Sequence, residues 1–259
     1  MRAAAAALRC LTEGPDWPLL AVAGLAWVIL LAADRIPGAP PICVAGGADP
    51  IASARLWLSS LAGWDGVAVL FAALVAMPVA MTAPLLQVPL SHVRRSALYE
   101  RRTRSLAFFL AGHLCAWALT VTVLMAVAFG FRLLVSSAFA ATGLVVAAGL
   151  IWHGAPFKPI ARNRSHVRLP LPACGARADA GAARYGAQSA GWCAASCWPL
   201  MLAPMTGGAA HLTMTVAAAA LMLCERTARP IGAVPRWRWI GAGAAVGASV
   251  VTGLLVSTP

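Results

Sequence analysis

The sequence predicts an all-α fold, a polytopic transmembrane helix bundle with about seven spans. The first observation is composition: 61% of the 259 residues are hydrophobic, 11% are charged, and the mean hydropathy is +0.79. Soluble domains contain roughly 45–50% apolar and about 25% charged residues. The other two observations are apolar runs of membrane-spanning length and an uneven distribution of basic residues between them. Together they exclude an ordinary soluble enzyme and a disordered chain.

Seven apolar runs are expected to be the spans. In chain order they cover residues 17–33, 66–86, 105–129, 133–153, 187–205, 209–224 and 239–257. Each approaches the ~20 residues that a helix needs to cross about 30 Å of hydrocarbon. The fifth and sixth runs are joined by Thr206-Gly207-Gly208 and are expected to form a tight helical hairpin. The run 51–64 is shorter and contains Arg55, which favours an interfacial helix over a span.

The basic residues orient these spans. Of the 20 lysine and arginine residues, only Arg35, Arg55 and Arg132 lie on one side of the predicted topology. By the positive-inside rule, the other side is cytoplasmic. We therefore expect a cytoplasmic N-terminal segment over 1–16, a single transmembrane domain over 17–257, an outer loop over 34–65, a basic cytoplasmic loop over 154–186 and an outer C-terminus. A multi-pass protein of the bacterial inner membrane fits this arrangement, and the net charge of +12 then reflects topology rather than nucleic-acid binding.

The sharpest chemical feature is a stripe of sulfur atoms in the fifth run. Cys193, Cys197, Met201 and Met205 recur every four residues, so they share one face of a helix that Pro199 is expected to kink. Thiolate and thioether groups are soft ligands that favour Cu(I), and thiolates also bind zinc. The alternative is that these side chains only fill the core, as cysteine and methionine often do.

Other candidate ligands lie at similar depth in the membrane. Met77 and Met81 of the second run are also four residues apart. Counting from the span midpoints at about 1.5 Å per residue puts Met77 level with Cys197 and Met81 level with Cys193. His113 of the third run falls near the depth of Cys193, where it could bind a metal or simply hydrogen-bond to a neighbouring helix. The predicted metal ligands are Cys193, Cys197, Met77 and Met81, with Met201 and His113 as second choices.

Several short motifs follow a known pattern. Cys193, Cys197, Trp198, Leu200 and Met201 match C-x-x-C-C-W-x-L-M, with Ser196 in the place of the middle cysteine. Met81 and Pro84 match A-M-M-x-P, with Thr82 in the place of the second methionine. Further matches are Ala111-Gly112-His113 followed by Trp117, where His113 takes the position of a tyrosine, then Pro156-Phe157-Lys158, and Glu225-Arg226. In these motifs the chain resembles, over roughly residues 65–255, a bacterial family described as predicted metal-binding integral membrane proteins of unknown function.

The resemblance implies a metal site within the membrane, built here from a reduced ligand set. The family usually has a C-x-x-C-R-like pair after the P-x-K motif, whereas this chain has Ala161 and Arg164 near those places. Two loop cysteines, one cysteine of the fifth run and one methionine of the second run are therefore replaced.

Three functions remain open at this point. The first is binding of a soft metal, copper or less favourably zinc, for metal handling or delivery to a membrane enzyme. The reduced ligand set motivates the second, a non-catalytic accessory or assembly subunit of a larger membrane complex. The prolines in the second and fifth runs motivate the third, a transporter of a small substrate or metal ion. Because no nucleophile is paired with a base in a recognisable motif, enzymatic activity is not expected. The expected partners are membrane lipids and a membrane protein.

Overall fold

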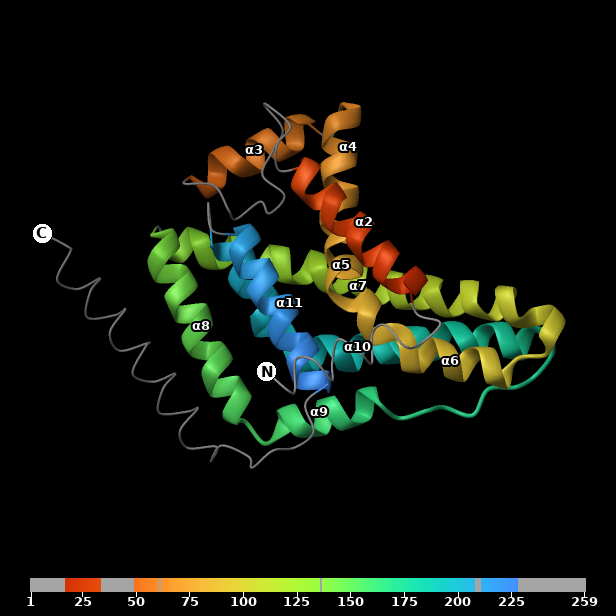
Figure 1. Cartoon of the computed structure of the whole chain (residues 1–259). Coiled ribbons are helices and arrows are strands. Elements are labelled where there is room, and N and C mark those ends of the chain that lie inside the picture. Colours follow the sequence, from red (N-terminus) through yellow and green to blue (C-terminus); the bar gives the residue numbers. More distant parts are fainter. Residues whose placement is uncertain (1–16, 34–48, 61, 136, 208–210, 228–259) are drawn as a thin grey trace, which may run out of the picture.

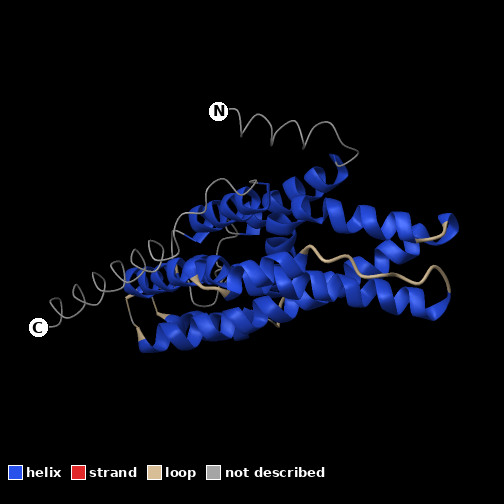
Figure 2. Cartoon of the chain, turned by 90° about the horizontal axis from the view of Figure 1, so that it is seen from below, coloured by secondary structure: helices blue, strands red, loops and turns tan. Residues whose placement is uncertain are grey.

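The computed structural model describes residues 17–33, 49–60, 62–135, 137–207 and 211–227, and every element in these ranges is a helix (Figures 1 and 2). The all-α fold class is confirmed for this part of the chain. In chain order the elements are α2 (Trp17–Ala33), α3 (Pro50–Ser60), α4 (Trp64–Phe71), the π-helix η2 (Ala72–Ala76), α5 (Met77–Thr82), the 3₁₀-helix η3 (Ala83–Leu86), α6 (Gln87–Ser96), the 3₁₀-helix η4 (Tyr99–Arg101), α7 (Arg102–Leu134), α8 (Ala138–Gly154), α9 (Phe157–Ser165), α10 (Gly175–Thr206) and α11 (His211–Thr227).

Helices are found at the first six predicted spans. By length and apolar composition, two continuous helical stretches within the described ranges could cross a membrane, Gly66–Ser96 and Tyr99–Leu134. A third is added if α8 and α9, which meet at a bend of 78°, form one broken span. α2 and α11 are apolar but shorter. The count of seven spans therefore stays a prediction, and the seventh run, the segment 1–16 and residues 34–48 of the outer loop lie outside the described residues.

The basic segment 154–186, expected to be a loop, contains two helical parts. It holds α9 and the first turns of α10, which begins at Gly175 rather than near residue 187. Residues 175–188 are rich in alanine, the residue with the highest helix propensity, so the helix extends well beyond the apolar run. Hydropathy alone does not detect such an extension, because alanine, arginine and glutamine alternate there.

The second predicted span is helical but irregular. It passes from α4 through the π-helix η2 and the short α5 into the 3₁₀-helix η3. Pro78 and Pro84 lack the backbone N–H that a regular helix needs, and the Thr82 hydroxyl donates a hydrogen bond of 2.7 Å to the Pro78 carbonyl. The second span is therefore locally distorted around these prolines. In α10, by contrast, the helix continues through Pro199 and Pro204.

α7 and α10 form the axis of the bundle and lie side by side over much of their length (Figure 1). Their packing divides the interior into two apolar cores. One lies among α2, α5, α7, α10 and α11 and contains the buried sulfur atoms. The other lies where α6, α7 and the beginning of α10 meet, and it consists of Leu86, Val93, Phe109, Ala182 and Tyr185. The first core is the one that positions the candidate site.

An ion-pair cluster fixes the beginning of α10 to the beginning of α7. The Asp179 carboxylate accepts hydrogen bonds of 2.8 Å from Arg101 and Arg104. Burial alone would raise the pKa of Asp179, but the hydrogen bonds from the two guanidinium groups hold that pKa below its ordinary value. Arg101 and Arg104 are among the basic residues that the predicted topology places on the cytoplasmic side.

Candidate metal site

The sulfur stripe of α10 faces the interior of the bundle. Cys193, Cys197, Met201 and Met205 are all buried, and all four belong to one apolar core. The spacing of four residues keeps them on one side of the helix, as the sequence predicts. The helix that carries them is packed against α7, α8, α9 and α11, so the stripe is enclosed by other helices.

Two further helices bring methionines to the same core. Met77 and Met81 of α5 are buried there, as is Met222 of α11. Met77 and Met81 therefore belong to the same apolar core as the cysteines, and their convergence with Cys193 and Cys197 on one metal stays a prediction. Met222 was not among the predicted ligands. The depth argument could have found it, because it lies roughly 8 Å on the cytoplasmic side of the midpoint of the run 209–224, close to the depth of Cys193.

A small cavity brings the two thiols and one thioether together. Its volume is about 10 Å³, and it is lined by Arg162, Cys193, Ser196, Cys197, Met222 and Glu225. That volume is enough for about one water molecule or a small ion. The residues that line the cavity come from α9, α10 and α11. The cavity therefore forms only when these three helices are packed together.

A hydrogen bond orients the Cys197 thiol, and the Cys193 backbone carbonyl is its acceptor. The Cys197 thiol donates to the Cys193 carbonyl over 3.0 Å, and the Ser196 hydroxyl donates to the same carbonyl over 2.7 Å. Both bonds are local to one helical turn, the usual way in which such side chains are satisfied inside apolar helices. Since Cys197 donates, its thiol carries a proton in this state.

A charged cluster borders the cavity at Glu225. Lys158 Nζ lies 2.6 Å from both Glu225 Oε1 and His153 Nδ1, and that His153 nitrogen lies 3.1 Å from the same Glu225 oxygen. Burial raises the pKa of Glu225, but the hydrogen bonds from His153 and Lys158 outweigh it and hold the pKa below its ordinary value. Glu225 is therefore an anion that is already paired with a cation.

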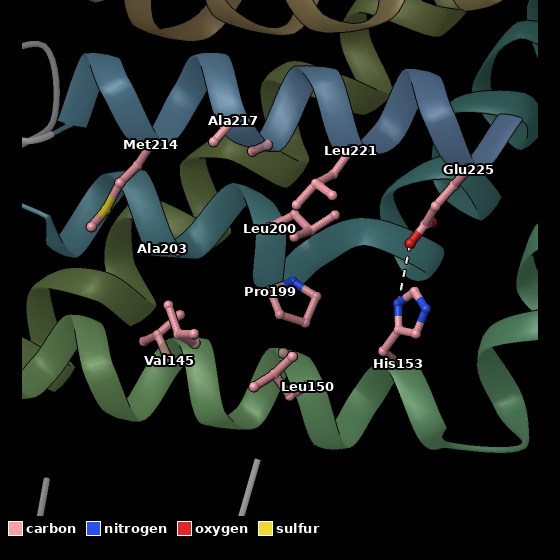
Figure 3. A pocket seen from close by; sticks show the side chains of 13 residues that line it. Val145, Leu150, His153, Pro199, Leu200, Ala203, Met214, Ala217, Leu221 and Glu225 are labelled. Atoms are coloured by element: carbon pink, nitrogen blue, oxygen red, sulfur yellow. Dashed lines mark ion pairs between the residues drawn. The ribbon is translucent and has the colours of Figure 1, made fainter. Parts of the chain in front are cut away.

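Two larger apolar cavities also border α11. One of about 250 Å³ lies between α8, α10 and α11, with Pro199 and Leu200 in its wall and His153 and Glu225 at its polar end (Figure 3). The other, of about 500 Å³, lies between α2, α5 and α11 and is lined in part by Met81. Met81 therefore faces a different cavity from the one that the cysteines line.

His113, a second-choice ligand in the sequence analysis, lies at the contact of α7 with α10. Its ring stacks on Phe109 with the centroids 6.0 Å apart, and it does not line the small cavity. The backbone of Gly186 lies near the imidazole, but neither ring nitrogen makes a hydrogen bond of acceptable geometry to a described residue. The indole nitrogen of Trp117, one turn further along α7, is also buried and makes no hydrogen bond to a described residue.

The donor set indicates which metal would fit. Among the described residues, no group of three or more histidine, cysteine, aspartate or glutamate side chains could hold a metal ion. A site here must therefore use thioether sulfur as well as thiolate. Structural zinc usually takes four nitrogen, thiolate or carboxylate ligands, whereas thiolate and thioether together select Cu(I). The residues present fit Cu(I) better than zinc.

The comparisons with known proteins agree with this chemistry. A family model described as PpoB2, copper chaperone, matches residues 69–251. The matched range includes all six predicted ligands and Met222. The expected resemblance to a metal-binding family is confirmed for a copper-related family, which the matching model describes by function. No curated protein and no solved structure matches the chain.

Proposed function

The chain belongs to the PpoB2 family of copper chaperones, and from that premise we propose that it binds one Cu(I) ion between α10 and α11 and passes it to a partner protein. The observation that carries the proposal is the small cavity lined by Cys193, Cys197 and Met222. Cu(I) prefers soft sulfur donors. Two thiolates and one thioether supply three of them.

Binding follows from the protonation state of the site. The incoming ion displaces the two thiol protons, two S–Cu bonds form, and the protons leave to solvent. Met222 adds a neutral sulfur donor. Cys197 gives up its hydrogen bond to the Cys193 carbonyl, which Ser196 still satisfies. The rearrangement is therefore confined to side chains, and the backbone carbonyl is not left without a partner.

The remaining thioethers suggest a route for the ion. Met201 and Met205 continue the stripe of α10 away from the charged cluster, and Met77 and Met81 lie in the same core. We propose that these four methionines are transient ligands during transfer, whereas the two cysteines and Met222 set the affinity. Thioethers bind Cu(I) without releasing protons, so the ion can exchange between them without a change in protonation.

The proposed setting is the bacterial inner membrane, with seven spans and the N-terminus in the cytoplasm. Large apolar side chains on the outer faces of α2, α7 and α8 support contact with lipid, among them Leu25, Leu119, Val123, Leu134 and Phe139. A chaperone acts on another protein, and for a membrane-embedded carrier we propose a membrane copper enzyme as the recipient. We assign the chain no catalytic step and no nucleic-acid partner.

The test is copper binding by the purified full-length protein in detergent under reducing conditions. We expect about one Cu(I) per chain in the wild type and almost none in the double variant Cys193→Ser/Cys197→Ser. The matched control is Cys115→Ser/Cys224→Ser, because both of these cysteines are exposed rather than buried in the core. Equal copper content in the wild type and the Cys193/Cys197 variant would contradict the proposal.

The same preparation separates the two alternative functions. An accessory subunit predicts no bound metal in the wild type and a partner that co-purifies with the chain. A transporter predicts metal flux when the protein is reconstituted in liposomes. Bound Cu(I) that moves to an acceptor protein, without flux across the bilayer, supports the chaperone function.

A further inference from the structure

Arg162 lines the cavity that holds the two cysteines, together with Glu225, which is paired elsewhere. It lies on α9, one turn after Lys158, on the side of that helix that packs against α10. Lys158 is paired with Glu225. Arg162 is half-buried and forms no ion pair with any carboxylate of the described residues. The cavity is therefore lined by two cysteines and by a guanidinium that has no ion pair among the described residues.

The charge of the bound complex depends on the metal. Two thiolates carry two negative charges, and Met222 adds none. A complex with Cu(I) therefore has a net charge of minus one, whereas a complex with a divalent ion is neutral. Glu225 does not change this count, because Lys158 already balances it. An isolated anion in an apolar interior is costly unless a cation lies next to it.

We propose that Arg162 is the counter-cation of the Cu(I) complex and makes the site selective for a monovalent ion over divalent ions. The reaction that it assists is the exchange of two thiol protons for one Cu(I) ion, which forms two S–Cu bonds and releases both protons to solvent. The guanidinium stabilises the anionic product of this exchange. It gives no such stabilisation to the neutral product that a divalent ion would form. This inference rests on the proposed copper site at Cys193, Cys197 and Met222.

The expected effect can be bounded with Coulomb's law. Two unit charges about 4 Å apart at an effective dielectric constant of about 20 would change a binding constant by up to roughly a thousandfold. Because Arg162 is only half-buried, water screens much of this interaction, and the expected change falls to roughly tenfold. The affinity for a divalent ion should change by less than about threefold.

The experiment compares Cu(I) with Cd(II), a soft divalent ion that also binds thiolates. Affinities of the purified full-length protein are measured by competition with chelators of known strength. The variants are Arg162→Gln, which removes the charge, and Arg162→Lys, which keeps it. The control is Arg164→Gln, two residues along the same helix, whose exposed guanidinium lies over the Trp192 ring with its central carbon 5.0 Å from the centroid.

We expect Arg162→Gln to weaken Cu(I) binding about tenfold and to leave Cd(II) binding unchanged or slightly stronger. Arg162→Lys should keep the wild-type ratio of the two affinities, and Arg164→Gln should keep both affinities. An equal loss for both ions in Arg162→Gln would mean a structural role only and would overturn the inference. A ratio of Cu(I) to Cd(II) affinity that is the same in Arg162→Gln as in the wild type would overturn the inference as well.

The outcome is separable from a failure of the proposed function. If the wild type binds no Cu(I), or binds it without Cys193 and Cys197, the proposed function is wrong and the inference falls with it. If Cu(I) binding depends on the two cysteines but is indifferent to Arg162, only the inference is wrong.

Discussion

Gly112 on α7 and Gly186 on α10 each lie directly against the backbone of the opposite helix. A Cβ atom added to Gly112 would lie 2.0 Å from the Ala183 carbonyl oxygen, and one added to Gly186 would lie 2.0 Å from the Phe109 carbonyl oxygen. Both distances are far below van der Waals contact. The two glycines therefore allow an approach of the helix backbones that no other residue would permit. This crossing lies about two turns before Cys193 along α10 and fixes α10, which carries the sulfur stripe, against α7.

We expect Gly112→Ala and Gly186→Ala each to destabilise the protein by about 2–3 kcal/mol, because the added methyl group meets backbone rather than a movable side chain. The matched controls are Gly130→Ala on α7 and Gly191→Ala on α10, where an added Cβ meets nothing within 4 Å. These should be neutral or stabilising by up to about 1 kcal/mol, since alanine favours the helix. Thermal unfolding in one detergent measures all four. Equal effects at the crossing and control positions would refute the close approach.

Replacement of Met222 tests the third ligand. Met222→Leu keeps the apolar volume and removes the thioether, so we expect Cu(I) affinity to fall about tenfold or more while the stability changes by less than about 1.5 kcal/mol. Met214→Leu is the control. Met214 lies on the same helix, but it lines the apolar cavity of about 250 Å³ instead of the small cavity with the cysteines. Competition with a Cu(I) chelator measures both variants. A weaker site in Met214→Leu than in Met222→Leu would contradict the assignment.

The proposed route predicts a kinetic effect without a loss of affinity. The double variant Met201→Leu/Met205→Leu should hold Cu(I) within about threefold of the wild-type affinity and should transfer it several-fold more slowly to an acceptor. Stopped-flow transfer to a chromophoric Cu(I) chelator gives the rate, and the equilibrium competition gives the affinity. A loss of affinity as large as that of Met222→Leu would place these methionines in the resting site rather than on a route.

The lowered pKa of Glu225 predicts how the free energy of unfolding depends on pH. Its folded pKa is lowered from an ordinary value of 4.5, so its contribution is fully present above about pH 5 and is lost as the pH falls through the lowered pKa. Wild-type stability should therefore decline on acidification below pH 5. Glu225→Gln should be less stable at pH 7 by about 1–3 kcal/mol, because Lys158 loses its carboxylate partner, and should decline less steeply.

The control for this prediction is Glu100→Gln, at an exposed glutamate outside the cluster. It should keep the wild-type dependence of stability on pH. Asp179 contributes with the same sign, since its pKa is also lowered, and Asp179→Asn should flatten the remaining slope. If Glu225→Gln declines as steeply as the wild type, the cluster does not account for the acid sensitivity.

The parts of the site that follow from helical geometry were predictable from the sequence. The spacing of Cys193 and Cys197 needs only a regular helix to place both thiols on one face. Depth along a span assigned Met77 and Met81 to the level of the cysteines, and both belong to the same apolar core. Depth, however, says nothing about rotation around the helix axis, and the π-helix and prolines of the second span alter that rotation. For this reason the sequence could not tell that Met81 faces the cavity beside α2 rather than the small one.

Contacts between distant segments were beyond the sequence. Lys158 and Glu225 are 67 residues apart, and nothing local to either indicates that they meet. His113 satisfied every criterion of depth and burial, yet it lies at the crossing of α7 and α10 with its ring on Phe109. Met222 satisfied the same depth criterion, but the other methionine of its run, Met214, is eight residues away, so Met222 lacks the spacing of four that indicates a sulfur stripe.

All three cavities described above border α11. They have volumes of about 250, 10 and 500 Å³; the first two share Glu225, and the third is lined by other residues of this helix. A helix with free volume on its flanks can tilt or slide without compressing its neighbours, whereas α7 and α10 are locked backbone to backbone. Because the cysteines lie on α10 and Met222 lies on α11, a tilt of α11 would move Met222 away from the two cysteines of the proposed site. Under the proposed function, a protein that docks on α11 and displaces it would then remove one of the three sulfur ligands and favour release of the ion.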